Sequence, residues 1–547
     1  MSVRARSLVV VSTLALALPA AAQWSTDPAS PLILTSAAGD QNQPKIRPFP
    51  GGGFVVSWLG TQATGWDTWV QRIDAGGNPL WTSGGIVAAD TNFSSTEDYG
   101  LAVDADGNTL VAFRDDSSPF VQIALQKISP SGELLFGPHG LTISASTGGA
   151  DGVHAPDVVV ASDGSYIVSY SRSSSTTNGR AWYQKVSPTG ELLWGGGEGV
   201  SIAPATNSYN AGRMVPTPDG GVIAILQTSG AFTANRRIHV QKLDGATGAQ
   251  VWNGGTPIVV QEANQLQIGY TAPAISDGAG GAIVAWYEVP NGAFQCRVQR
   301  ISADGTLLFP AGGAVAATTP GLMRTNPAIA FDPATNETYM AFVEQTTDQN
   351  NRGVYAQKFD ATGARQWTDA GLQVTPLAGG GASPSFLNVT ITDGGAIVSF
   401  FEGTNPSATT AVVKAAKIDT EGALSWPEGV ITVNTNGHAA KARMEAVEDT
   451  GGASVLVYAD AAAGDYDIAV TRINADGSLG GGAPTCPPDW DDNGSVNSTD
   501  ISAFLTSWLD SLNQGNLDAD FNGDGQVNST DISAFLTSWL DAVTTGC

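Results

Sequence analysis

An internal repeat fills residues 30–480 and constrains the fold more than any other feature. Its marker is Gln, then Lys or Arg, then an apolar residue, with a Trp or Phe after the next turn; the last two copies are degenerate, with Ala416 and Thr471 in place of Gln. Eight copies lie 55–59 residues apart. They begin at Gln71, Gln126, Gln184, Gln241, Gln299, Gln357, Ala416 and Thr471. A period of this length indicates one supersecondary unit per repeat, each packed on its neighbours.

The sequence of each repeat unit predicts about four short strands. A Gly-rich turn leads into a β-branched strand that is apolar on both faces, as in residues 52–58 and 280–286, and this is typical of a strand buried between two sheets. No helical periodicity interrupts residues 30–480. We therefore expect a mainly β fold, an eight-bladed β-propeller spanning residues 23–480. A solenoid or an elongated β-array is the architectural alternative.

The two ends of the repeat region predict how the ring closes. The last copy stops near Gly480 without its aromatic residue and its final strand. The chain begins with an additional strand at residues 31–35, which resembles the segments that follow the aromatic residue in other copies. This N-terminal strand is expected to complete the last blade, which would hide two sheet edges at once.

A duplicated acidic loop follows a short linker at residues 481–485. Residues 496–510 and 527–541 are identical, and each is preceded by a 12-residue pattern of oxygen-bearing side chains with Gly at position 6. Calcium takes six to eight oxygen ligands, and such a loop wraps them around one ion. The pattern predicts two Ca²⁺ ions. The expected ligands are Asp489, Asp491, Asn493, Ser495, Asn497, Asp500, Asp520, Asn522, Asp524, Gln526, Asn528 and Asp531.

Each loop runs directly into a predicted helix. The apolar residues Ile501, Phe504, Leu505, Trp508 and Leu509 form one stripe at helical spacing, and the second copy repeats it. A module of about 60 residues buries little surface, so metal ions are expected to supply stability that its core cannot. Two cysteines lie at the ends of the module, Cys486 and Cys547, and they are expected to form a disulfide. The third, Cys296, is expected to be a buried small residue in a strand.

Residues 486–547 resemble a type I dockerin, because each of two loops is followed by a helix and neither is preceded by one. The resemblance implies a cohesin-like protein partner. It also implies that Ser498, Thr499, Ser529 and Thr530 contact that partner through two equivalent faces. Helix capping is the alternative role for these hydroxyl residues. The basic residues that many dockerins carry further along the helix are absent, since Leu505, Thr506 and Asp510 stand there.

The repeats themselves resemble those of secreted bacterial propeller-like proteins of unassigned function. More faintly, residues 189–194 and 247–252 resemble the Thr-Gly-x-x-x-Trp blades of pyrroloquinoline-quinone dehydrogenases. The adjacent cysteines typical of many alcohol-oxidising members of that family do not occur in this sequence.

The N-terminus and the net charge set the expected location. Two arginines, an apolar run over residues 8–18 and Ala20–Ala22 predict a signal peptide, residues 1–22, cleaved near Ala22. The chain is therefore expected to be secreted or associated with the cell surface, with no membrane span after cleavage. A net charge of −26 disfavours nucleic acid and anionic membranes as partners.

The sequence contains no recognisable catalytic motif. The first hypothesis is a secreted calcium-binding docking protein, whose propeller binds or displays a ligand such as a polysaccharide or a cell-surface group. The alternative is an extracellular glycoside hydrolase-type component of polysaccharide breakdown, whose two carboxylates would come from different blades. The third hypothesis is a quinone-dependent dehydrogenase.

Overall fold

The computed structural model describes residues 24–62, 65–89, 98–116, 121–147, 152–173, 179–203, 208–229, 236–261, 266, 271–379, 383–404, 411–437, 443–480, 488–490, 496–514, 519–522 and 526–545. The expected signal peptide, the linker at 481–485 and the pair Cys486 and Cys547 lie outside the described residues. Within the described ranges, no helix is both long and apolar enough to cross a membrane.

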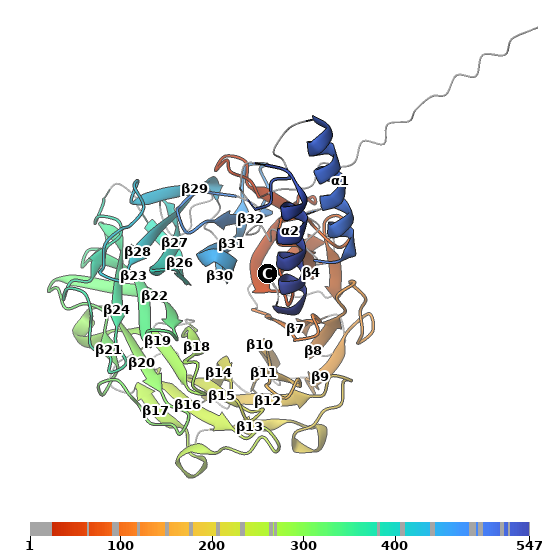
Figure 1. Ribbon diagram of the computed structural model, residues 1–547. Coiled ribbons are helices and arrows are strands. Elements are labelled where there is room, and N and C mark those ends of the chain that lie inside the picture. Colours follow the sequence, from red (N-terminus) through yellow and green to blue (C-terminus); the bar gives the residue numbers. More distant parts are fainter. Residues whose placement is uncertain are drawn as a thin grey trace, which may run out of the picture.

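Separate antiparallel sheets stand side by side in a propeller-like ring (Figure 1). Six of them have four described strands each. They are β2 (Gln41–Pro48), β3 (Phe54–Gln62), β4 (Gly65–Ile73) and β5 (Ile86–Ala89); β6 (Gly100–Val103), β7 (Thr109–Asp115), β8 (Gln122–Ile128) and β9 (Leu141–Ala145); β10 (Gly152–Val160), β11 (Tyr166–Ser173), β12 (Arg180–Val186) and β13 (Val200–Ile202); β14 (Ser208–Pro216), β15 (Val222–Ser229), β16 (Ile238–Leu243) and β17 (Ile258–Gln261); β18 (Ala274–Ser276), β19 (Ala282–Glu288), β20 (Gln295–Ile301) and β21 (Ala314–Val315); β22 (Leu322–Asp332), β23 (Glu337–Thr346), β24 (Arg352–Phe359) and β25 (Leu372–Gln373). Short 3₁₀ helices lie between strands at η1 (Gly195–Gly197), η2 (Trp252–Gly255), η3 (Pro290–Gly292) and η4 (Thr450–Gly452).

The remaining strands form one eight-stranded sheet that joins the two ends of the repeat region. It contains β26 (Ser383–Thr392), β27 (Gly395–Gly403), β28 (Ala411–Asp419), β29 (Val430–Gly437), β30 (Glu445–Asp449), β31 (Ala453–Asp460), β32 (Asp467–Ile473) and β1 (Leu32–Thr35). A single residue pair, Gly437 with Asp460, links its two halves through β29 and β31. Strand β1 pairs antiparallel with β32, with Leu32 opposite Val470. The expected completion of the last group of strands by residues 31–35 is thus confirmed.

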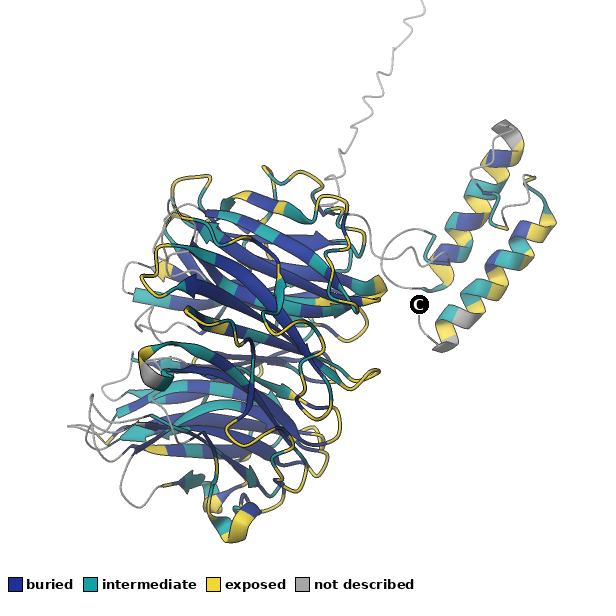
Figure 2. Cartoon of the chain, turned by 90° about the vertical axis from the view of Figure 1, so that its left-hand side faces the viewer, coloured by how far each residue is buried: buried dark blue, intermediate teal, exposed yellow. Residues whose placement is uncertain are grey.

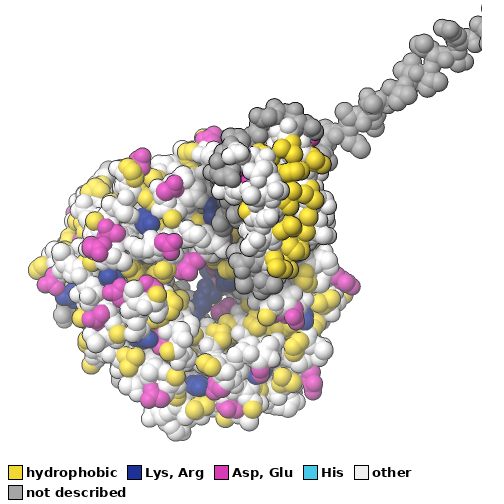
Figure 3. Space-filling view, in the orientation of Figure 1, with side chains coloured by type: hydrophobic (Ala, Val, Ile, Leu, Met, Phe, Trp, Pro, Cys, Tyr) yellow, Lys and Arg dark blue, Asp and Glu magenta, His cyan; other side chains and the backbone are white. Residues whose placement is uncertain are grey.

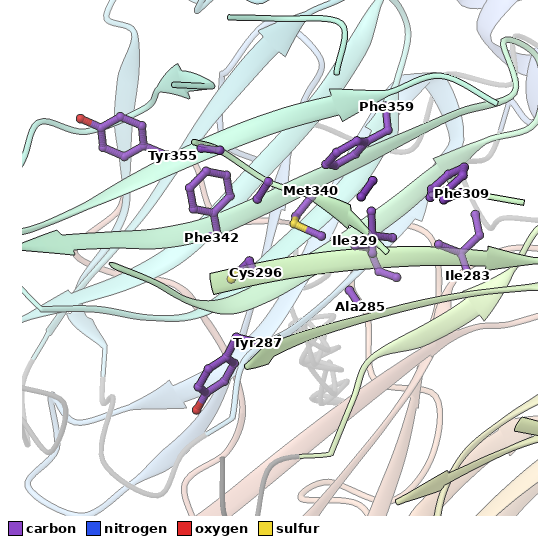
Figure 4. Close-up of a cluster of buried hydrophobic side chains, with 14 residues drawn as sticks. Ile283, Ala285, Tyr287, Cys296, Phe309, Ile329, Met340, Phe342, Tyr355 and Phe359 are labelled. Atoms are coloured by element: carbon purple, nitrogen blue, oxygen red, sulfur yellow. The ribbon is translucent and has the colours of Figure 1, made fainter. Parts of the chain in front are cut away.

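The cores lie between neighbouring sheets. In one of them, side chains of β19 and β20 pack against β22, β23 and β24 (Figure 4). Ile283, Met340 and Phe359 meet there with almost no exposed surface. Cys296 of β20 is fully buried in the same cluster, as expected, and burial raises the pKa of its thiol. Each sheet is therefore apolar on both faces, which explains why these strands are rich in β-branched residues.

The Gln of each repeat marker is a buried hydrogen-bonding group. In the first copy, the side-chain oxygen of Gln71 accepts hydrogen bonds from the backbone N–H groups of Arg72 and Trp81. Its side-chain nitrogen donates to the carbonyl oxygen of Thr82. The five other Gln copies hold the turn that carries their aromatic residue through the same backbone N–H, at 2.8–3.2 Å. The marker thereby fixes the position of the aromatic residue.

Each aromatic residue packs against a turn glycine of the next repeat. A Cβ atom on any of these glycines would lie 2.6–3.3 Å from the aromatic ring, so a larger residue would displace the ring. All eight glycines have a positive φ, which favours glycine further. The pairs are Trp24–Gly77, Trp81–Gly132, Phe136–Gly190, Trp194–Gly248, Trp252–Gly305, Phe309–Gly363, Trp367–Gly422 and Trp426–Gly477.

The first of these pairs closes the cycle. Trp24 precedes β1 and is 3% exposed, and its indole N–H donates to the carbonyl oxygen of Ala75 at 2.7 Å. Trp426 donates to Ala475 in the same manner at 3.0 Å. Because the last repeat has no aromatic residue of its own, Trp24 supplies it from the other end of the chain. The sequence analysis identified the closing strand but did not identify this tryptophan.

Replacing Trp24 tests the closure. Trp24→Ala is expected to destabilise the ring by about 3–5 kcal/mol, because a large buried ring is removed and its glycine cannot fill the space. Trp24→Phe keeps the ring and loses the hydrogen bond, at a cost of about 1 kcal/mol. Urea unfolding of the full chain, followed by tryptophan fluorescence and circular dichroism, measures both. Equal midpoints for Trp24→Ala and the unaltered protein would contradict the closing role.

A buried carboxylate pair near the closure predicts a pH dependence. Asp467 of β32 lies opposite Asp460 of β31, and both are at most 5% exposed. Burial, followed by the charges of Asp465 and Asp460, raises the pKa of Asp467 to about 6. Because the pKa is raised, the protonated carboxyl stabilises the folded state. This stabilisation is complete below the unfolded pKa of about 4 and is lost as pH rises through about 6.

Asp467→Asn mimics the protonated group. It is expected to melt close to the unaltered protein at pH 4 and roughly 1–2 °C higher at pH 8. Asp348→Asn is the control of opposite sign, because hydrogen bonds from Thr346 and Asn350 lower the pKa of Asp348. That variant should be less stable than the unaltered protein above about pH 4, and the difference should disappear as pH falls below about 4. Calorimetry from about pH 2 to pH 8 measures both, and a pH-independent difference for Asp467→Asn would oppose the assignment.

Candidate functional site

The C-terminal module consists of two helices around an aromatic core (Figure 2). Helix α1 spans Ser498–Gln514 and helix α2 spans Ser529–Thr545. Phe504 and Phe535 are fully buried and stack with their ring centres 4.2 Å apart and their planes parallel within 1°. They occupy the same position in the two copies, so the duplicated sequence folds into a symmetric pair.

Each helix also holds the loop of the other copy. The indole N–H of Trp508 in α1 donates to the carbonyl oxygen of Asn528 at 2.9 Å, and the indole N–H of Trp539 in α2 donates to that of Asn497 at the same distance. The two acidic loops are thus coupled through the core, and a change in the geometry of one loop reaches the other.

The described part of the acidic loops contains two fully buried carboxylates. Asp500 accepts a hydrogen bond from the backbone N–H of Asn497 at 2.8 Å, and Asp531 accepts the equivalent bond from Asn528 at 2.7 Å. Asp531 also accepts the backbone N–H of Asn522 at 3.2 Å. Asp489 and Asp520 are half-buried, and Gln526 is exposed. Four of the expected ligands lie outside the described residues: Asp491, Asn493, Ser495 and Asp524.

The chemistry of these loops fits a calcium ion. Residues 486–547 contain ten Asp and no Lys, Arg or His, so the module has no cation of its own to neutralise two buried carboxylates. Burying an ionised carboxylate without a counter-charge is costly. A hard divalent cation bound by carboxylate, amide and carbonyl oxygens supplies that charge. Each loop would hold its ion through the carboxylates at positions 1 and 12. These are Asp489 and Asp500 in the first loop and Asp520 and Asp531 in the second.

The helix caps differ from the expected alternative. The side-chain oxygens of Asn497 and Asn528 accept the backbone N–H groups of Thr499 and Thr530, at 2.9 and 2.8 Å. The asparagine one position before each pair of hydroxyl residues therefore caps one of the free N–H groups of the helix. Ser498, Thr499, Ser529 and Thr530 are all exposed.

The apolar helix stripe is only partly buried. Phe504 is buried, but Leu505 and Leu509 are 37% and 55% exposed. A pair of helices can bury one face of each, and Phe504, Trp508 and their copies fill that interface. The remaining apolar residues lie on the surface. They are Leu505, Leu509 and Leu512 of α1 and Leu536, Leu540 and Val543 of α2.

A second charged site lies at the centre of the ring, where Figure 3 shows Lys and Arg side chains in the hollow. We call it the channel cluster: Lys45, Arg47, Asp98, Asp157, Arg213, Arg443 and Glu445. The lysine ammonium lies 2.9 Å from Asp98. Arg443 reaches Asp98 at 2.7 Å, and Arg47 reaches Glu445 at 2.8 Å. Four cations thus face three carboxylates.

β-Bulges in the innermost strands aim these side chains. The pairing of β2 with β3 shifts just before Lys45, that of β10 with β11 just before Asp157, and that of β14 with β15 around Arg213. Gln43 and Ala155 at the first two bulges have φ of 52°. A bulge bends a strand and re-aims the next side chain. Bulges in three of the sheets therefore bring charges from distant repeats to one place.

The cluster keeps its groups ionised against burial. Burial opposes the charge on Asp98, but Lys45, Arg443 and Arg213 outweigh it and hold the pKa of Asp98 well below its usual range. The same balance, with Arg47 as the largest favourable charge, lowers the pKa of Glu445. For Lys45, which is almost completely buried, desolvation wins and lowers the pKa of the ammonium.

The sequence analysis did not find the channel cluster. The signal that it overlooked is a Pro directly before a charged residue at the start of a repeat, Pro44–Lys45 and Pro156–Asp157. Pro is confined to edge strands and bulges, so these dipeptides mark the bulged inner edge of a sheet.

Comparison with known proteins identifies the C-terminal module. The model of the family described as Dockerin type I domain matches residues 487–535. The expected type I dockerin module is thus confirmed, and it supports a docking role. No curated protein matches the chain.

Several solved structures resemble the chain weakly. A PL25 ulvan lyase bound to -[GlcA(1-4)Rha3S]- is 12% identical, with 83% of this chain and 96% of that chain covered and a TM-score of 0.39. The polysaccharide lyase Uly1 is 12% identical, with 67% and 88% covered and a TM-score of 0.37. A mutant of Synechocystis apocarotenoid oxygenase is 14% identical, with 58% and 68% covered and a TM-score of 0.34. Likeness at this level carries no argument about activity.

The crossed tryptophan contacts predict that the two calcium loops are coupled. Trp508→Phe keeps the aromatic core and removes the hydrogen bond to Asn528, so calcium affinity is expected to fall about fivefold, as for the loss of about 1 kcal/mol. Titration calorimetry on the full chain measures it. Trp81→Phe removes a similar indole bond, to Pro130, in the ring and serves as the control. Equal affinities in the two variants would contradict the coupling.

Proposed function

We propose that this chain is a secreted, calcium-dependent docking protein. Its dockerin module, residues 486–547, attaches an eight-bladed propeller, residues 23–480, to a partner, and the propeller serves as a rigid binding platform. Two calcium ions, one in each acidic loop, hold the module folded. The absence of any basic residue in a module that buries Asp500 and Asp531 supports this requirement for calcium.

The observation that carries the docking proposal is the apolar surface of the two helices. Six large apolar side chains are 37–60% exposed there. Figure 3 shows hydrophobic side chains gathered along the helices. Exposed apolar patches of this kind mark protein interaction sites. With no Lys or Arg in the module, the partner is a cohesin-like domain that offers an apolar surface.

The exposed hydroxyl residues lie at the N-terminus of each helix, one turn or more before the exposed leucines. Ser498 and Thr499 precede Leu505 and Leu509 on α1, and α2 repeats the arrangement. Apolar contacts and hydroxyl hydrogen bonds along one helix would form a single interface. The duplication would offer the partner two equivalent interfaces, used one at a time.

The cycle of aromatic residues supports eight blades. Eight aromatic–glycine contacts link eight copies of the turn, and the contact of Trp24 with Gly77 returns to the first copy. The eight-stranded sheet divides at its single pair, Gly437 with Asp460, into two groups of four strands.

The channel cluster favours a binding platform over a glycoside hydrolase. Glycoside cleavage needs a carboxylic acid with a raised pKa to protonate the leaving group. Glu445 and Asp98 instead have lowered pKa values, because Arg47, Lys45 and Arg443 surround them. Such carboxylates orient guanidinium groups and are poor proton donors.

Docking is tested with the full chain on a surface coated with type I cohesin domains. Binding is expected in calcium and is lost in excess chelator. Because either interface suffices, Leu509→Gln alone should leave the affinity within about twofold, whereas L509Q/L540Q should weaken it at least tenfold, as for loss of an apolar hot spot.

The matched control is L135Q/L308Q, since Leu135 and Leu308 are 43% and 41% exposed on the ring. That variant should bind like the unaltered protein. Failure of every cohesin domain to bind in calcium, or equal binding by L509Q/L540Q and the control, would reject the proposal.

A further inference from the structure

The channel cluster has a charge opposite to that of the protein. The chain carries a net charge of −26, with twice as many acidic as basic residues. The cluster nevertheless gathers four of the 25 Lys and Arg residues against three carboxylates. A concave site with low-dielectric walls focuses its own field. The centre of the ring therefore attracts anions, although the rest of the surface repels them.

The three carboxylates do not occupy all the guanidinium donors. Arg443 uses one terminal nitrogen on Asp98, and among the described residues its Nε and Nη2 meet no acceptor. Arg213 contacts Asp157 and Asp98 only loosely, at 3.5 and 3.7 Å. The side chains of Arg47, Arg213 and Arg443 are 29–36% exposed. They can accept a further anion without breaking their present contacts.

A cavity of about 460 Å³ lies against two of these arginines, Arg47 and Arg213. Their partners Asp157 and Glu445 also line it, together with apolar residues of the inner strands such as Leu101, Val159 and Met214. Its volume is within the range of roughly 300–1,000 Å³ typical of small-molecule sites. The site thus combines charge, free donors and apolar walls, which are the elements of a small-molecule binding site.

We propose that this cavity binds a small ligand through an oxyanion, a carboxylate, sulfate or phosphate group, held by Arg213 and Arg47 at its lining, with Arg443 adding positive charge from beyond the lining. The planar guanidinium group matches such oxyanions with two parallel hydrogen bonds. The apolar walls would contact the uncharged body of the ligand. The proposal rests on the platform role of the propeller and is independent of the docking role, because no residue of the dockerin module takes part.

Four sugars that share one ring and differ in their charge test the proposal on the full chain in calcium. Glucuronate offers a carboxylate, glucose 6-sulfate a sulfate and glucose 6-phosphate a phosphate, whereas glucose is neutral. Titration calorimetry at low salt is expected to detect at least one charged sugar, with at least tenfold weaker binding of glucose. The preferred sugar identifies the oxyanion.

Variants identify the residues. Arg213→Gln is expected to weaken binding of the preferred sugar at least tenfold, and Arg213→Lys to weaken it less, since charge remains without the planar fork. Arg443→Gln should also weaken binding, but by less than Arg213→Gln, because it removes only a charge beyond the cavity lining. Arg365→Gln is the control, because Arg365 pairs with Asp369 on the outer surface. Melting temperatures check folding, and Arg47→Gln provides a second variant at the cavity lining if Arg213→Gln is unstable.

Two results would overturn the proposal. One is that no charged sugar binds more tightly than glucose. The other is that the Arg213 and Arg443 variants bind like Arg365→Gln. Neither result would affect cohesin binding, so a failure of the channel site is distinguishable from a failure of docking.

Discussion

The ring depends on one repeated contact, an aromatic side chain laid against a turn glycine of the next repeat. The marker Gln holds six of the eight aromatic residues in place, and the glycine leaves room for each of the eight. A stack of sheets that are apolar on both faces is stable only when no face remains open. The cycle therefore needs its last contact, between Trp24 and Gly77, as much as any other. Two segments more than 400 residues apart in sequence, β1 and β32, meet for this reason.

A closed ring in turn creates the channel cluster. Inner strands converge at the centre, so charges that bulges re-aim in separate repeats, such as Lys45, Asp157 and Arg213, come within reach of each other. Ion pairing there offsets the cost of burial, and one positive charge remains in excess. The dockerin module buries Asp500 and Asp531 without any basic residue, so the counter-charge that we propose for it is a metal ion.

Sequence reasoning was most successful where a pattern repeats. The spacing of the markers predicted four-stranded units and the closing strand, and the duplicated loop predicted the dockerin module. It was less successful where one position has two possible environments. The leucines at 505 and 509 share the helical period of Phe504, yet only a partner helix decides which of them is covered. The asparagines at 497 and 528 fit both a calcium loop and a helix cap, and the backbone geometry decides that they cap.

The sequence by itself determined the repeat, the strands of each unit, the aromatic residues and glycines that join them, and the acidic loops, because all of these follow from local periodicity and spacing. Only the tertiary structure decided that Trp24 completes the cycle, that seven charged residues, four of them on three bulged strands, come together, and that six apolar side chains of the helices face solvent. These features depend on contacts between residues far apart in the chain. Periodicity says which face of an element is apolar, but only packing says what covers it.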